Sequence, residues 1–206
     1  MFRYILNLMS INVNIMTVTS EIRCLREYQL ISIPSFLQLS SEERVLVNRS
    51  IEKNYLKSPV SFGDTYEGYN FPIVEDDTLF FSHLYERYKA VSYNFFGNFH
   101  ITPQNKTTCW CYRSNTDWAT SNWHNHLYTS TINGVYYHQV DGDGIFFERN
   151  GTFFHHVPQQ GELLIFPNNL NHRPDMTTSQ SLRYSINMEI KTEESATTLF
   201  KNYGLS

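Results

Sequence analysis

Most of the chain after Gly97 reads as short β-strands separated by turn residues, and this pattern restricts the fold more than any other feature of the sequence. Aromatic residues make up 16% of the chain, and they favour the pleated, half-buried surface of a sheet. Strand-like runs lie at 98–102, 107–113, 126–140, 144–149, 152–156, 162–166 and 183–190. Many short strands in succession predict a barrel or a sandwich of antiparallel strands.

Two helices are expected before these strands. The first starts at Ser40 or Ser41 and reaches about residue 56, because either serine can cap it and two glutamates follow in its first turn. The second starts at Asp76 or Asp77 and reaches about residue 96, with apolar residues along one side. This order predicts a mainly β fold with N-terminal helices: a double-stranded β-helix, the cupin-like jelly roll, with helices bracing one sheet.

The chain has 206 residues and no linker-like tract, so a single domain over residues 25–206 is expected. Residues 1–24 are interpreted as an N-terminal extension, either disordered or preceding a true start at Met9 or Met16. The apolar stretch up to Met16 is interrupted by polar residues and is too short to cross a bilayer. No small-residue cleavage site follows it, so no secretory signal and no membrane partner are expected.

The charge and the cysteines restrict the partners and the compartment. The net charge is −4, which gives no basic field and therefore no strong signal for nucleic-acid binding. Cys24 stands apart, and Cys109 and Cys111 are poorly placed for a bond within one strand. Without a disulfide framework, a cytoplasmic location is expected, which is the host cytoplasm if the chain is viral.

Three histidines form a candidate metal centre. His124 and His126 stand two residues apart in a strand-like run, so both imidazoles point to one face, about 7 Å apart at the backbone. With 8 histidines in the chain, roughly 0.3 such pairs arise by chance, so the pair alone is weak. His172 follows a second apolar run and strengthens the signal. The pattern predicts a metal held by His124, His126 and His172.

The last strand-like run carries a polar stripe. Alternation places Arg183, Ser185 and Asn187 on one face, while the other face is apolar. Such a stripe needs a polar partner, and a guanidinium can form a forked, charge-assisted contact with a carboxylate. A metal centre beside an anchored acidic cosubstrate indicates an oxygenase.

A set of motifs over about residues 107–190 carries a family resemblance. The motifs are Trp123-His124-Asn125-His126, Asn133-Gly134-Val135-Tyr136-Tyr137, Pro158, Gly161-Glu162-Leu163-Leu164-Ile165-Phe166-Pro167, His172 and Arg183-Tyr184-Ser185-Ile186-Asn187. Together they resemble the 2-oxoglutarate/Fe(II) oxygenases of phages and bacteria, and more distantly they are similar to prolyl hydroxylases. The combination is much more specific than any single motif.

The resemblance implies a role for each matching residue. His124 and His172 match the two histidines that hold the catalytic iron. Arg183 and Ser185 match the pair that binds the 5-carboxylate of 2-oxoglutarate. Tyr137 matches a tyrosine that often helps to bind that carboxylate. The implied cofactor is Fe(II), and the implied cosubstrate is 2-oxoglutarate.

His126 departs from the family pattern, which usually has a carboxylate at this position. Two arrangements fit the sequence. Either His126 is the third metal ligand, or it lies behind the ligands or faces the substrate while water holds the third position.

The resulting prediction is a 2-oxoglutarate- and Fe(II)-dependent dioxygenase that hydroxylates an unidentified substrate and releases succinate and CO₂. A protein side chain is the first expectation for the substrate, with a small molecule or a modified base as alternatives. Loops at 58–75 and 113–122 are expected to gate the site. Four phenylalanines are expected to keep it dry: Phe146, Phe147, Phe153 and Phe166.

Two other classes of protein stay open. A three-histidine cupin dioxygenase that does not use 2-oxoglutarate explains His126 but leaves Arg183 and Ser185 without a role. A non-catalytic, ligand-binding jelly roll leaves both motifs without a role.

Overall fold

The computed structural model describes residues 22–57, 70–103, 109–114, 122–140, 142–175 and 182–205. The helices are η1 (Arg26–Tyr28), α1 (Ser41–Lys57), α2 (Phe80–Phe96) and α3 (Ala196–Asn202). The strands are β1 (Arg23–Leu25), β2 (Leu30–Ile33), β3 (Asn70–Pro72), β4 (Cys109–Ser114), β5 (Ile132–Gln139), β6 (Ile145–Arg149), β7 (Thr152–His156), β8 (Leu163–Pro167), β9 (Asn171–Pro174) and β10 (Arg183–Ile190).

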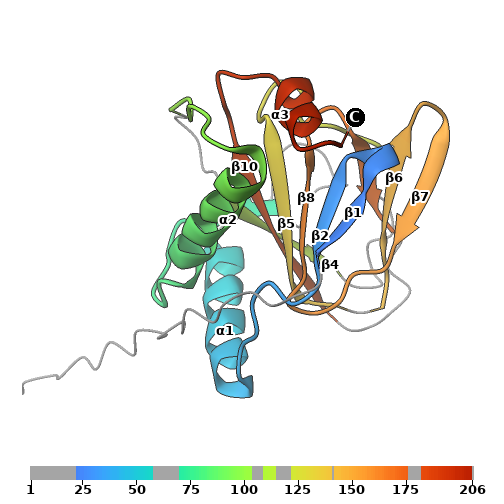
Figure 1. The fold of residues 1–206 in the computed structure, drawn as a ribbon. Coiled ribbons are helices and arrows are strands. Elements are labelled where there is room, and N and C mark those ends of the chain that lie inside the picture. Colours follow the sequence, from blue (N-terminus) through green and yellow to red (C-terminus); the bar gives the residue numbers. More distant parts are fainter. Residues whose placement is uncertain are drawn as a thin grey trace, which may run out of the picture.

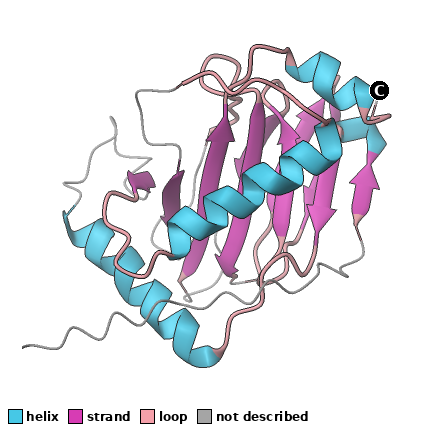
Figure 2. Cartoon of the chain, turned by 60° about the vertical axis from the view of Figure 1, so that its left-hand side comes forward, coloured by secondary structure: helices cyan, strands magenta, loops and turns pink. Residues whose placement is uncertain are grey.

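Two antiparallel sheets and a layer of helices build the domain (Figure 1). The large sheet has seven strands in the order β1-β2-β8-β5-β10-β4-β3, and the small sheet has three in the order β7-β6-β9. Helices α1, α2 and α3 lie on one side of the large sheet, with α2 running across its face (Figure 2). The small sheet lies on the other side. This arrangement confirms the predicted mainly β, double-stranded β-helix fold.

Side chains of β5 and β10 alternate between two hydrophobic cores. Tyr136 and Ile186 belong to the core between the large sheet and the helices. Tyr137 belongs to the core between the two sheets, together with Phe166 of β8 and Phe147 of β6. We call the face of the large sheet toward the small sheet the inner face. The candidate site residues of β10 have the parity of this inner face.

Glycine at position 134 allows α2 to lie close to the sheet. A Cβ atom there would come within 2.6 Å of the Tyr88 ring, well inside van der Waals contact. Tyr88 is fully buried, and its hydroxyl donates to the carbonyl of Ile132 over 2.9 Å. The helix layer is thus pinned to β5 directly behind the candidate site.

Most predicted elements agree with the structure, and the differences have local causes. The strand predicted at 126–140 begins only at Ile132, because the amides of Thr129 and Ser130 both turn back to the carbonyl of His126. The run at 98–102 forms only an isolated bridge between Ile101 and Thr192. Strands β1, β3 and β9 and helices η1 and α3 were not predicted. Residues 1–21 of the predicted extension lie outside the described residues.

The two helix starts differ in how well the sequence signals them. At α1, the amide of Glu43 donates to the Ser40 hydroxyl and the amide of Ser40 donates to the Glu43 carboxylate, a reciprocal capping box that confirms the prediction. At α2, Leu79 has a left-handed φ of 57°, so the helix starts at Phe80, later than predicted. Asp76 still accepts from the amide of Ser82, but from outside the helix.

Among the described helices, none combines the length and apolar character needed to cross a membrane.

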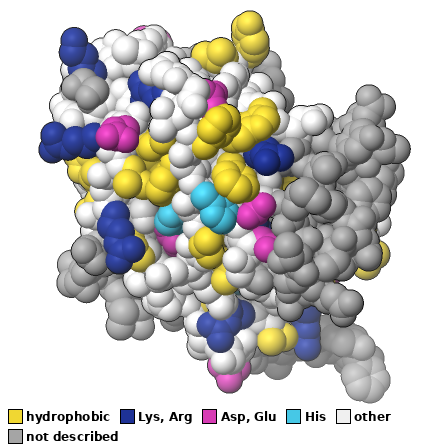
Figure 3. All heavy atoms as spheres, turned by 90° about the vertical axis from the view of Figure 1, so that its right-hand side faces the viewer, with side chains coloured by type: hydrophobic (Ala, Val, Ile, Leu, Met, Phe, Trp, Pro, Cys, Tyr) yellow, Lys and Arg dark blue, Asp and Glu magenta, His cyan; other side chains and the backbone are white. Residues whose placement is uncertain are grey.

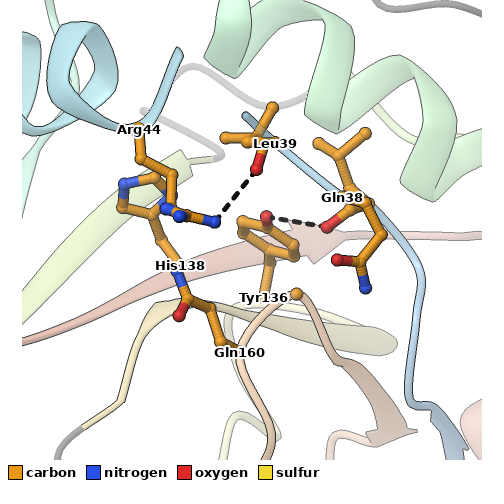
Figure 4. A pocket seen from close by; sticks show the side chains of 8 residues that line it. Gln38, Leu39, Arg44, Tyr136, His138 and Gln160 are labelled. Atoms are coloured by element: carbon orange, nitrogen blue, oxygen red, sulfur yellow. Dashed lines mark hydrogen bonds between the residues drawn. The ribbon is translucent and has the colours of Figure 1, made fainter. Parts of the chain in front are cut away.

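A small polar pocket lies on the helix side of the large sheet (Figure 4). Its volume is about 80 Å³, and its lining includes Arg44, Tyr136 and His138. His138 is buried, and its Nε2 lies 2.8 Å from the side-chain oxygen of Asn48. Burial, aided by the charge of Arg44, lowers the pKa of His138 from 6.5 to about 4. His138 is therefore neutral in the folded protein at neutral pH.

This buried histidine should make the fold acid-sensitive. As pH falls through 6.5, the unfolded chain protonates His138 while the folded chain does not until about pH 4, so folding stability is lost across this window. Between pH 6.5 and pH 4, the free energy of unfolding is expected to fall by roughly 3 kcal/mol because of His138. We expect His138→Gln, which keeps a donor toward Asn48, to lose that part of the pH dependence in urea titrations. Parallel pH profiles for the two proteins would contradict the assignment.

Candidate metal centre

The backbone pairs His124 directly with His172. The amide of His124 donates to the carbonyl of His172 over 3.0 Å, and the amide of His172 donates back over 2.9 Å. Directly paired residues of an antiparallel bridge point to the same side. The two imidazole rings accordingly lie 4.3 Å apart, between their centroids.

His126 joins this pair from the turn that follows. Its amide donates to the carbonyl of Asn168 over 2.8 Å, which anchors the turn to the segment before β9. One ring nitrogen from each of the three histidines lies within 4.8 Å of the others, and the Nε2 atoms of His126 and His172 are 3.3 Å apart. Adjacent ligands bound at about 2.1 Å from one ion are about 3 Å apart, so the spacing suits a single ion.

The Nδ1 atoms of the three rings are occupied by other groups. Nδ1 of His124 lies 2.9 Å from the carbonyl of Asn122, and Nδ1 of His172 lies 2.9 Å from the carbonyl of Leu170. Carbonyls only accept, so both Nδ1 atoms carry the proton and leave an Nε2 lone pair. Nδ1 of His126 lies 2.9 Å from Oε1 of Glu189.

Burial keeps the innermost histidine neutral. His172 is 5% exposed, and burial lowers its pKa well below the usual range, with a further lowering by the charges of His124 and His126. The Phe166 and Phe147 rings lie 4.8 and 6.2 Å from the His172 ring, so one wall of the site is apolar. A neutral imidazole in such a site is a suitable metal ligand.

The prediction that four phenylalanines line the site is half wrong. Phe147 and Phe166 face inward, but Phe146 and Phe153 have the opposite parity on the small sheet. Phe146 stacks on His155 at 4.3 Å, and Phe153 is 63% exposed. Strand alternation is the physical reason, since neighbours on one strand cannot share a face. Seen from the side of the molecule that lies to the right in Figure 1, hydrophobic side chains gather beside histidine on the surface (Figure 3).

A buried cation lies on the inner face of the large sheet. Arg183 is 2% exposed, and its Nη1 donates to the carbonyl of Gly144 over 2.9 Å. Among the described residues, its Nε has no hydrogen-bond partner, and none of their ion pairs involves Arg183. Its guanidinium carbon lies 5.4 Å from the centre of the Tyr137 ring. A buried charge normally has a partner, so Arg183 is a candidate residue for binding an anion.

Ser185 and Tyr137 lie next to this cation. They are directly opposite each other where β10 pairs with β5, and both are buried. The Tyr137 hydroxyl has no hydrogen-bond partner among the described residues. Burial raises the pKa of Tyr137, although the charge of Arg183 opposes this, so the hydroxyl keeps its proton and can donate it.

Glu189 was missed in the sequence analysis. Its side chain is 2% exposed and contacts His126, at the end of β10 opposite to Arg183. The signal was present, because the stripe of Arg183, Ser185 and Asn187 continues with the same alternation to Glu189. Most of both predicted gating loops, 58–69 and 115–121, lies outside the described residues.

Comparisons with known proteins identify the fold. No model of a protein family matches the chain, and no curated protein matches it. A prolyl hydroxylase from Trichoplax adhaerens, solved with a peptide of the hypoxia inducible factor oxygen degradation domain, superimposes with a TM-score of 0.61. The match has 16% identity and covers 88% of this chain and 89% of that one.

Two further solved structures agree with this match. A 2OG-Fe(II) oxygenase family oxidoreductase from Burkholderia pseudomallei has 14% identity and a TM-score of 0.56, over 85% of this chain and 91% of that one. HygX from Streptomyces hygroscopicus, solved with nickel and 2-oxoglutarate, has 12% identity and a TM-score of 0.52, over 78% and 81%. The resemblance that the motifs indicate is therefore confirmed at the level of the fold.

The three histidines should bind one divalent ion per chain. We expect His124→Ala and His172→Ala each to weaken Co(II) binding by more than about 100-fold, because each removes one of three nitrogen donors. Circular dichroism should show an intact fold in both variants. His155→Ala is the matched control, since His155 lies on the outer side of the small sheet and pairs with Asp175. Wild-type affinity in either site variant would remove that histidine from the centre.

Proposed function

We propose that this protein is a 2-oxoglutarate- and Fe(II)-dependent dioxygenase that hydroxylates its substrate and releases succinate and CO₂. The observation that carries the proposal is the buried cation of Arg183, which has no carboxylate partner among the described residues. It lies on the inner face of the large sheet, and His172 of the small sheet points toward that same face, against Phe166. The histidines suit a metal, and Arg183 suits a dicarboxylate beside it. The fold shared with 2-oxoglutarate oxygenases supports the proposal.

Three histidines would hold the iron: His124, His126 and His172. When bound, iron and 2-oxoglutarate together supply an oxidant that inserts one oxygen atom of O₂ into a C–H bond, while the other oxidises 2-oxoglutarate to succinate and CO₂. The work of the chain is to keep three Nε2 lone pairs directed at one point. The carbonyls of Asn122 and Leu170 do this for His124 and His172.

Arg183 would bind the far carboxylate of 2-oxoglutarate. Its Nη1 is held by Gly144, so its Nε and second Nη are the donors left for a forked contact. Tyr137 and Ser185 would add hydroxyl donors to the same group. Phe147 and Phe166 limit the entry of water beside His172.

We further propose a protein side chain as substrate and the cytoplasm as compartment. The Trichoplax adhaerens prolyl hydroxylase is in complex with a peptide, which supports a polypeptide substrate here. The described cysteines are all free thiols, which is compatible with a reducing compartment.

The two alternative functions differ from the proposed one in the ligands that the protein binds. A three-histidine cupin dioxygenase would bind metal without 2-oxoglutarate, and a non-catalytic jelly roll needs neither. The deciding experiment adds Fe(II) and then 2-oxoglutarate without oxygen, because chelation of the cosubstrate gives a weak visible charge-transfer band. Oxygen is then admitted, and succinate and CO₂ are measured. A metal-loaded protein without the band and without succinate would point to the cupin reading.

Arg183→Lys should weaken 2-oxoglutarate binding by about 2 kcal/mol, because lysine keeps the charge but cannot form the fork. The dissociation constant is measured from the visible band under anaerobic conditions. Arg44→Lys is the control, since Arg44 also donates to a backbone carbonyl, that of Leu39, but lies in the pocket on the helix side. Equal affinity in wild type and Arg183→Lys would exclude Arg183 from the cosubstrate site.

A further inference from the structure

A buried carboxylate lies behind one of the three histidines. Oε1 of Glu189 is 2.9 Å from Nδ1 of His126, the ring nitrogen that does not face His172. The hydroxyl of Thr129 donates to the same oxygen over 2.6 Å. The Glu189 side chain is only 2% exposed, so water screens its charge poorly.

The three histidines alone leave the site with an uncompensated charge. Neutral imidazoles do not reduce the charge of a divalent ion, whereas a carboxylate ligand cancels one unit of it. At position 126 this chain has an imidazole. Burying two positive charges without a counter-charge is costly, and the cost falls when an anion lies nearby.

Glu189 is placed to act on the ion through His126. Its oxygens are not in the group of ligand atoms that lie within 4.8 Å of one another. Its negative charge favours the proton on Nδ1 of His126, which leaves the Nε2 lone pair directed toward the ion. A carboxylate in this position also makes the imidazole of His126 a stronger metal ligand.

We propose that Glu189 supplies, from behind His126, the negative charge that a carboxylate ligand would otherwise bring to the metal. Glu189 is thus a positioning residue, and His126 is the ligand through which it acts. The proposal rests on the proposed metal centre and extends it to a residue on the last strand. With Glu189 behind His126, a centre of three histidines has a negative charge close to the ion.

The first test measures metal affinity, without turnover. The metal-free full chain is titrated with Fe(II), and separately with Co(II), under anaerobic conditions. We expect Glu189→Gln, which keeps the size and one oxygen of the side chain, to weaken both ions by about 10- to 100-fold.

Glu162→Gln is a matched control. Glu162 is equally buried, contacts His156 over 2.7 Å and accepts from the Ser32 hydroxyl over 2.7 Å. It therefore reproduces the carboxylate, histidine and hydroxyl arrangement without a link to the metal centre. Its metal affinity should stay within about twofold of wild type, whatever its effect on stability.

The second test reverses the sign of the effect. In His126→Asp, a carboxylate enters the metal site itself, and Glu189 then places a second negative charge close to it. Adding Glu189→Gln to His126→Asp should leave Fe(II) affinity equal or higher, whereas the same change weakens it when His126 is present. A residue that only stabilises the fold would weaken binding in both backgrounds, because its contribution does not depend on the ligand at position 126.

Each outcome separates this proposal from the one on which it rests. If wild type binds neither ion, the metal centre itself is wrong. If wild type binds and Glu189→Gln binds equally well, only the role of Glu189 is wrong. If Glu189→Gln alone does not fold, the comparison within the His126→Asp background decides: equal or tighter binding supports the proposal, and weaker binding overturns it.

Discussion

The backbone hydrogen bonds between His124 and His172 are the constraint on which the candidate site depends. They join two segments that are distant in the sequence, and they do so through groups that any residue possesses. The short segment before and within β9 presents three carbonyls in alternation: those of Asn168, Leu170 and His172. These accept from the His126 amide, the His172 ring and the His124 amide. One short segment, a turn followed by the start of β9, thus helps to set the positions of all three imidazoles.

Strand β10 connects this centre to the rest of the domain. Its inner face carries Arg183 at one end and Glu189 at the other, about 20 Å apart along the strand at roughly 3.3 Å per residue. Its opposite face carries Tyr184, Ile186 and Met188, which are buried against the helices. The helix layer therefore supports the strand from behind, so that the polar side chains in front keep fixed positions. This support holds the buried charges of Arg183 and Glu189 in place on the inner face of the large sheet.

The sequence predicted the parts of the structure that depend on local patterns. Period-two alternation indicated most strands and the shared face of Arg183 and Ser185, and a capping serine followed by two glutamates marked the start of α1. Features that depend on pairing between distant segments were less accessible. The inward direction of Phe147 rather than Phe146 requires the register of β6 against β9, where Phe147 lies opposite His172. The contact between Glu189 and His126 requires the end of β10 to meet a turn that interrupts a predicted strand.

The contact between Glu189 and His126 bears on how such centres change during evolution. If the negative charge near the ion can lie either on the ligand at position 126 or behind it at position 189, these two distant positions must together supply one carboxylate. A lineage passing from one arrangement to the other must go through a chain with both carboxylates or with neither. With both carboxylates, the two negative charges repel each other beside the ion. With neither, the chain holds the ion weakly. The residue that position 126 tolerates therefore depends on the residue at position 189, so the two positions are coupled through the ion that they serve.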